Sequence, residues 1–184
     1  MPVSVSRFAP EEVHGLSRAL WIAAVVFAGL FTVLASLFTA GYAMEDPGGV
    51  AGLVLIATWL VPILIGIVLA VRRPALAFRV LIVVVALALA VGTWQVIDPR
   101  TLHEWEFTNG PVTAIASFAT MLPIALTARY RLWPCALLML LAAGALLAPE
   151  LRAGMHLGSS GAVALPMLLD AGILGLAAAL APSR

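Results

Sequence analysis

Six long apolar runs alternate with short polar connections along this chain. The runs cover residues 19–43, 50–71, 75–97, 112–128, 132–147 and 161–181. A helix needs about 20 mostly apolar residues to cross the hydrocarbon core of a bilayer, and most of the runs reach that length. The fourth and fifth runs are shorter, and we expect their helices to extend a little beyond them. The pattern predicts an all-α polytopic membrane protein: six transmembrane helices in a single domain, residues 1–184.

Arginine residues lie mainly on alternate connections between the runs. One predicted side of the membrane carries Arg7, Arg18, Arg72, Arg73, Arg129, Arg131 and Arg184, with Arg79 just inside the third run. The other side has only Arg100 and Arg152. Short cytoplasmic loops carry an excess of basic residues, so both termini are expected in the cytoplasm. Residues 1–17 then form a short cytoplasmic tail.

Composition narrows the possible functions. Apolar residues make up 63% of the chain and charged residues only 10%, which excludes an ordinary soluble domain. No basic segment is dense enough in sequence to follow a nucleic-acid backbone. The single cysteine, Cys135, excludes an internal disulfide, and we interpret it as a small buried side chain. No run contains a histidine, so a bis-histidine haem site within the bundle is excluded and no cofactor is predicted.

Small residues and prolines indicate how the helices pack. Helices approach one another closely in lipid where side chains are small, so helix contacts are expected at Gly92, Gly144, and Gly172 with Gly175, among others. Prolines lie within the second, fourth and sixth runs, at Pro62, Pro123 and Pro166. Each proline removes one backbone hydrogen bond and bends its helix. These kinks are expected to splay the bundle locally.

Two residues within the runs are candidates for function. Trp59 lies deep in the second run, three residues before Pro62, and its indole N–H needs an acceptor such as a freed carbonyl or a ligand oxygen. Asp170 is the only carboxylate near a predicted bilayer midplane, where an acidic group is costly enough to suggest function. The structural alternative is that Asp170 is protonated or capped by a hydroxyl and only holds helices together.

Enzyme-like chemistry is sparse in this sequence. A candidate set lies on the predicted outer face, where His103, Glu104 and Glu106 could meet Glu150 and His156 if their two loops came together. Acidic loops exposed to solvent have the same residue types, so the spacing of these residues does not specify a metal site. The chain is therefore interpreted as non-enzymatic. The alternative is a small membrane transporter or membrane enzyme that uses Asp170 and these outer His and Glu residues.

Three short motifs together resemble the Insig family, the insulin-induced membrane proteins that sense sterols. Trp59, Pro62 and Gly66 reproduce the W-x-V-P-x-x-x-G signature of that family's second span. Glu106-Phe107-Thr108-Asn109 is similar to its acidic-Phe-x-Asn sequence before the fourth span, and Leu165-Pro166 with Gly172 is similar to its last span. The order and spacing of the motifs agree over residues 15–184. Six spans with cytoplasmic termini are also what the family implies.

The resemblance implies a lipid-binding regulator without catalytic activity. Trp59, Pro62 and Gly66 would line or shape a central cavity involving the second and fourth runs, and Phe107 with Asn109 would set the outer end of the fourth. The remaining residues predicted to contact lipid are Thr58, Thr113, Phe118 and Asp170. A proline kink beside a glycine opens space for an elongated apolar ligand. Homo-oligomers and a membrane-protein partner are further expectations.

The chain departs from the family at two places. Val112 or Thr113 stands where the family has a glutamine, and Thr127-Ala128-Arg129-Tyr130-Arg131 replaces aromatic residues followed by Asp-Arg-Ser. The resemblance therefore does not carry over oxysterol specificity or the eukaryotic partner surface. High alanine content and arginine without lysine suggest a bacterial gene, and hence a bacterial inner membrane. The expected ligand is an apolar lipid with a small polar head, such as a diacylglycerol, a terpenoid or a sterol.

Overall fold

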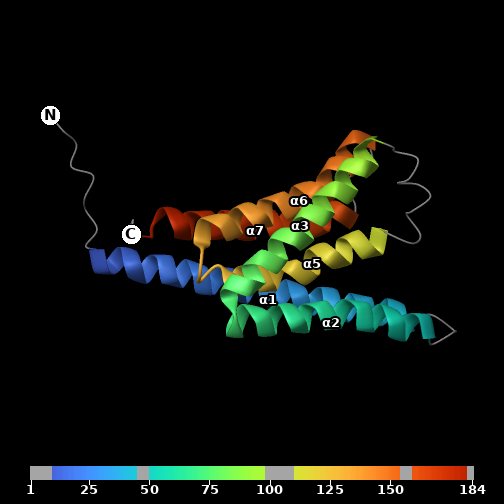
Figure 1. Cartoon of the computed structure of the whole chain (residues 1–184), viewed down its shortest axis with the longest axis horizontal. Helices are drawn as coiled ribbons and strands as arrows, with labels where there is room; N and C mark the ends of the chain where they lie inside the picture. Colours follow the sequence, from blue (N-terminus) through green and yellow to red (C-terminus); the bar gives the residue numbers. More distant parts are fainter. Residues whose placement is uncertain (1–9, 45–49, 98–109, 154–158, 182–184) are drawn as a thin grey trace.

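The computed structural model describes residues 10–44, 50–97, 110–153 and 159–181. These ranges contain six helices (Figure 1): α1 (Pro10–Met44), α2 (Val50–Arg72), α3 (Pro74–Ile97), α5 (Gly110–Thr127), α6 (Leu132–Ala153) and α7 (Ser159–Ala179). The predicted all-α fold is confirmed. Three stretches are long and apolar enough to cross a membrane, namely Gly15–Leu37, Pro74–Trp94 and Leu132–Pro149. The chain is therefore a membrane protein.

The helices extend beyond several of the predicted runs. Helix α1 begins at Pro10 and is 35 residues long, so the second half of the predicted tail is helical. Ser17 within this part is buried, and its hydroxyl donates a hydrogen bond to the carbonyl of Ala177, 2.8 Å away. Helix α6 continues to Ala153, six residues beyond the fifth run (153 against 147), as expected for that run. The start of α1 thus packs within the bundle.

Three side-chain hydrogen bonds bring the start of α1 and the ends of α2, α5 and α7 together. Ser17 on α1 bonds to Ala177 near the end of α7, and Trp21 Nε1 donates to the carbonyl of Ala125 near the end of α5 at 2.9 Å. Arg129, just after α5, donates to the carbonyl of Val71 near the end of α2 at 2.6 Å. We call this the arginine end of the bundle. Figure 1 shows α1 beginning and α7 ending on this side.

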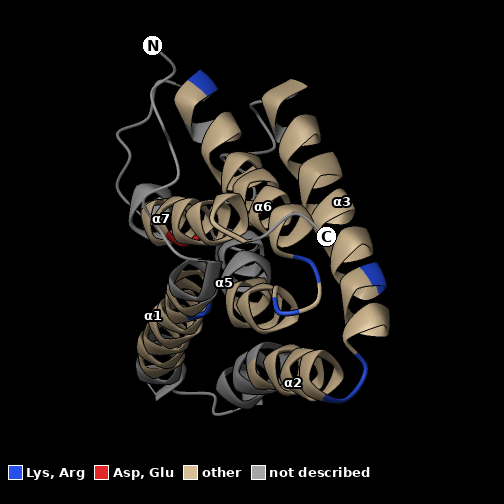
Figure 2. Ribbon diagram, turned by 90° about the vertical axis from the view of Figure 1, so that its left-hand side faces the viewer, with Lys and Arg blue, Asp and Glu red and all other residues tan. Residues whose placement is uncertain are grey.

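Helix α5 is the central element of the bundle. It contacts each of the other five helices, and Figure 2 shows it between α1, α2, α6 and α7. Most of its side chains between residues 119 and 128 are buried, with Met121, Ile124 and Pro123 among the most enclosed in the protein. A helix that is apolar on all sides fits this central position. The described centre of the bundle is therefore filled by side chains of α5.

Helices α3 and α6 are in close contact at Gly92. A Cβ built on Gly92 would lie 2.6 Å from the carbonyl oxygen of Ala145, so the backbone of α6 occupies the space that a side chain would need. This confirms the predicted close contact at Gly92. Of the predicted contact region at Ala142, Ala143 and Gly144, the two alanines are buried, whereas a Cβ built on Gly144 would meet no atom within 4 Å outside its own helix segment.

Candidate functional site

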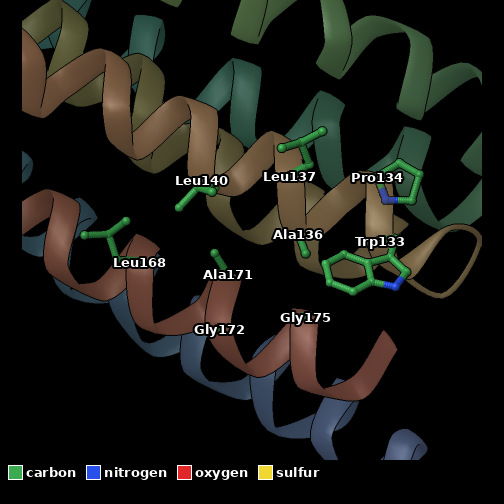
Figure 3. A pocket seen from close by; sticks show the side chains of 9 residues that line it. All are labelled: Trp133, Pro134, Ala136, Leu137, Leu140, Leu168, Ala171, Gly172 and Gly175. Carbon is green, nitrogen blue, oxygen red and sulfur yellow. The ribbon is translucent and has the colours of Figure 1, made fainter. Parts of the chain in front are cut away.

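An apolar groove lies between the first half of α6 and the second half of α7 (Figure 3). Its volume is about 530 Å³. Trp133 and Gly175 lie toward the arginine end, and Leu140 and Leu168 lie farther along their helices. The lining carries no ionisable side chain and consists of Trp133, Pro134, Ala136, Leu137, Leu140, Leu168, Ala171, Gly172 and Gly175.

The groove exists because small residues form its floor. Ala136 and Ala171 are buried beneath it, while Gly172 and Gly175 supply no side chain at all. A Cβ built on either glycine would have no other atom within 4 Å. The prediction that these two glycines make close helix contacts is therefore wrong within the described chain. They keep open a space that larger side chains would fill.

The rim of the groove is apolar and open on one side. Leu137 and Leu140 of α6 are exposed, as is Trp133, and all three belong to a helix long and apolar enough to span a membrane. Exposed leucines on such a helix face hydrocarbon chains in a bilayer. The open side of the groove is therefore expected to face hydrocarbon chains. Trp133, near the start of α6, also lines this groove.

The dimensions of the groove limit what can occupy it. Trp133 and Leu140, like Leu168 and Gly175, are seven residues apart, which corresponds to about 10 Å along a helix. Two turns of another helix, about 10 Å across and 10 Å long, would occupy roughly 800 Å³. That exceeds the 530 Å³ available. Hydrocarbon chains or fused rings fit wholly within this volume, whereas a helix would fill the groove only in part and project from its open side.

The second and fourth runs, where the sequence predicted a cavity, form α2 and α5, and these helices are in close contact around Gly66. A Cβ built on Gly66 would lie 2.6 Å from Cγ of Pro123, so α2 and α5 are in direct contact there. Pro62, one turn earlier on α2, is exposed. Both prolines lie inside their helices, as predicted. Around Gly66, the structure therefore brings the two predicted kinked helices together in tight packing.

Several predicted site residues fall outside the described part of the chain. The side chains of Thr58, Trp59, Thr113 and Phe118 are not described, although their backbones belong to α2 and α5. Phe107 and Asn109 lie outside the described residues. The same holds for His103, Glu104, Glu106 and His156 and for the side chain of Glu150. Their assigned roles stay predictions.

Asp170 is fully buried on α7, together with Met167 and Leu174 on the same face. Figure 2 shows the acidic segment of α7 on the side that faces α1 and α5. Neither Oδ1 nor Oδ2 accepts or donates a hydrogen bond within the described part of the protein. A buried carboxyl without a partner is costly, so Asp170 remains a candidate for function. Its neighbour Ala171 lines the groove, but Asp170 itself does not.

Cys135 is buried near the start of α6, as the sequence predicted. Comparison with protein-family models, with curated proteins and with solved structures finds no match. The resemblance to Insig proteins therefore rests on the sequence motifs alone.

Proposed function

We propose that this protein is a non-enzymatic lipid-binding membrane protein that acts as a sensor or scaffold. The observation that carries the proposal is the apolar groove between α6 and α7, whose rim includes exposed leucines of a helix long and apolar enough to span a membrane. Its volume of about 530 Å³ lies within the range of roughly 300–1,000 Å³ that is typical of small-molecule sites. The ligand is a membrane lipid with an elongated apolar body, of the diacylglycerol-like or sterol-like class that the Insig resemblance suggests.

The proposal places the protein in a bacterial inner membrane with its arginine end in the cytoplasm. Six of the ten arginines, Arg18, Arg72, Arg73, Arg79, Arg129 and Arg131, lie on the described helices and turns toward that end. Basic residues beside membrane spans are retained on the cytoplasmic side. The groove then opens into the inner leaflet. Lipid occupancy there would alter the exposed α6–α7 face. A second copy of the chain or another membrane protein that binds this face would then sense the lipid.

Filling the groove should reduce lipid binding. In the Gly172→Leu and Gly175→Leu variants, the new side chains would occupy space in the groove, because both positions line it and have open surroundings. We expect the retained lipid to fall roughly fivefold or more, equivalent to about 1 kcal/mol of binding free energy. Native mass spectrometry of protein purified in mild detergent, combined with lipid extraction, measures this retention.

Gly144→Leu is the matched control for this experiment. Gly144 is an exposed glycine on α6 with equally open surroundings, but it does not line the groove. Its lipid retention should equal that of the wild type. Equal retention in all three glycine variants would contradict the proposal. Loss in Trp59→Ala with no loss in Gly172→Leu would place the lipid at the second-span motif instead.

Asp170 supports a second candidate function, a small transporter. A fully buried carboxyl without a hydrogen-bond partner in the described residues is the kind of group that binds protons or cations in membrane carriers. A proton-coupled carrier should lose transport in Asp170→Asn, whereas a lipid-binding regulator should keep its lipid. Lipid retention measured alongside uptake into vesicles distinguishes the two functions.

A further inference from the structure

Two turns that are far apart in the sequence meet at the arginine end. Arg129, in the turn between α5 and α6, donates through Nη2 to the carbonyl of Val71 at 2.6 Å and to that of Ala70 at 3.4 Å. These carbonyls end α2, directly before Arg72 and Arg73. The contact fixes the α5–α6 turn against the α2–α3 turn, 58 residues away.

A second contact joins the same two regions. The guanidinium of Arg131 lies over the ring of Phe78 on α3, with its Cζ 5.8 Å from the ring centre, and 5.5 Å from the ring centre of Tyr130. Phe78 directly precedes Arg79. Both contacts hold the two regions side by side, and we call their exposed arginines the arginine corner: Arg72, Arg73, Arg79, Arg129 and Arg131. Figure 2 shows basic residues on both turns and on α3, at the end that faces the viewer.

Within the residues whose side chains the structure describes, no exposed acidic group offsets the positive charge of the arginine corner. All five arginines are exposed. Among the side chains that the structure describes, the only acidic one is that of Asp170, which is fully buried on α7. Like charges held close together repel one another, and a bound anion would relieve that repulsion. Arg129 and Arg131 are also held in place by their contacts, which lowers the entropy cost of binding.

The position of the corner indicates what that anion is. Its arginines lie at the ends of α2 and α5 and near the start of α3, where apolar spans reach the level of lipid headgroups. Exposed Tyr130 and Trp133 flank Arg131, and aromatic residues of this kind mark the membrane interface. Guanidinium groups match phosphate oxygens through paired hydrogen bonds. We propose that the arginine corner binds the phosphates of acidic phospholipids in the leaflet at this end of the protein.

Substitution of the exposed arginines tests this site. The combined Arg72→Gln, Arg73→Gln and Arg131→Gln variant leaves Arg129, which holds the two turns together, unchanged. The probes are phosphatidylglycerol, a diphosphatidylglycerol and phosphatidylcholine, each added to protein in neutral detergent. Native mass spectrometry counts the bound lipid, and thermal unfolding reports stabilisation. We expect the two acidic lipids to bind wild type in preference to phosphatidylcholine, and binding to fall roughly fivefold for each arginine removed.

Arg152→Gln is the matched control, because Arg152 is exposed at the far end of α6. It should bind acidic lipids like wild type. Unchanged binding in the triple variant, or an equal loss in Arg152→Gln, would overturn the proposal. Equal stabilisation by inorganic phosphate would also overturn it, since the site would then take free anions. The single variant Arg72→Gln provides the same comparison if the triple variant does not fold. Gly172→Leu should keep acidic-lipid binding, which separates this site from the groove.

Discussion

Replacing Gly92 with leucine should destabilise the bundle by roughly 3 kcal/mol or more, and replacing it with alanine by about 1–3 kcal/mol. A Cβ at this position would lie 2.6 Å from the carbonyl oxygen of Ala145 and 3.3 Å from its Cα. These are backbone atoms, so the contact cannot be relieved by rotating a side chain. Helices α3 and α6 would have to separate, and packing along their shared interface would be lost.

Unfolding in detergent, followed by circular dichroism or by titration with a denaturing detergent, measures this loss. Gly144→Ala is the matched control, because Gly144 directly precedes Ala145 and has no atom within 4 Å of a built Cβ. Alanine favours helix over glycine by about 1 kcal/mol, so the control should be neutral or slightly more stable. If Gly92→Ala were as stable as Gly144→Ala, α3 and α6 would not pack closely at this point.

Asp170→Val should stabilise the protein by about 1–3 kcal/mol. The carboxyl is fully buried, and no described group forms a hydrogen bond with it. Valine has a similar size but no polar atoms, so the substitution removes the desolvation cost while preserving most of the packing. Asp170→Asn retains a polar group of the same shape and should change the stability less.

Thermal unfolding of wild type and both variants in the same detergent tests this expectation. A large loss of stability in Asp170→Val would contradict it, because the carboxyl would then have a partner worth more than its desolvation. A stabilised Asp170→Val variant that also keeps its lipid would argue against a transport role for this residue. Asp170 would then lower the stability of the protein without taking part in transport.

The sequence predicted the helices and their shared end well because both depend on local patterns. Runs of apolar residues place each helix along the chain, and the alternating arginines required the ends of α2, α5 and α7 to lie beside the start of α1. The contacts of Trp21 with Ala125 and of Arg129 with Val71 have that arrangement. Neither feature depends on how each helix is rotated about its axis.

The position of the groove does depend on that rotation, which a single sequence does not specify. Gly66 was expected to open a cavity but packs against Pro123, whereas Gly172 and Gly175 were expected to pack but line the groove. All are glycines in apolar helices, so composition alone cannot separate them. The three-residue spacing of Gly172 and Gly175 on one helix, with Trp133 near the start of the preceding one, was the available signal. This spacing indicates a groove only when α6 and α7 are known to be neighbours.

Photo-crosslinking from the groove tests the central claim most directly. A photoreactive amino acid at Leu137, on the groove rim, is compared with the same amino acid at Leu87, which is exposed on α3 and does not line the groove. After irradiation in membranes, mass spectrometry identifies the adducts. The account predicts one enriched lipid species at Leu137 and a mixture that mirrors the bulk membrane at Leu87. The same bulk mixture at both positions would contradict it.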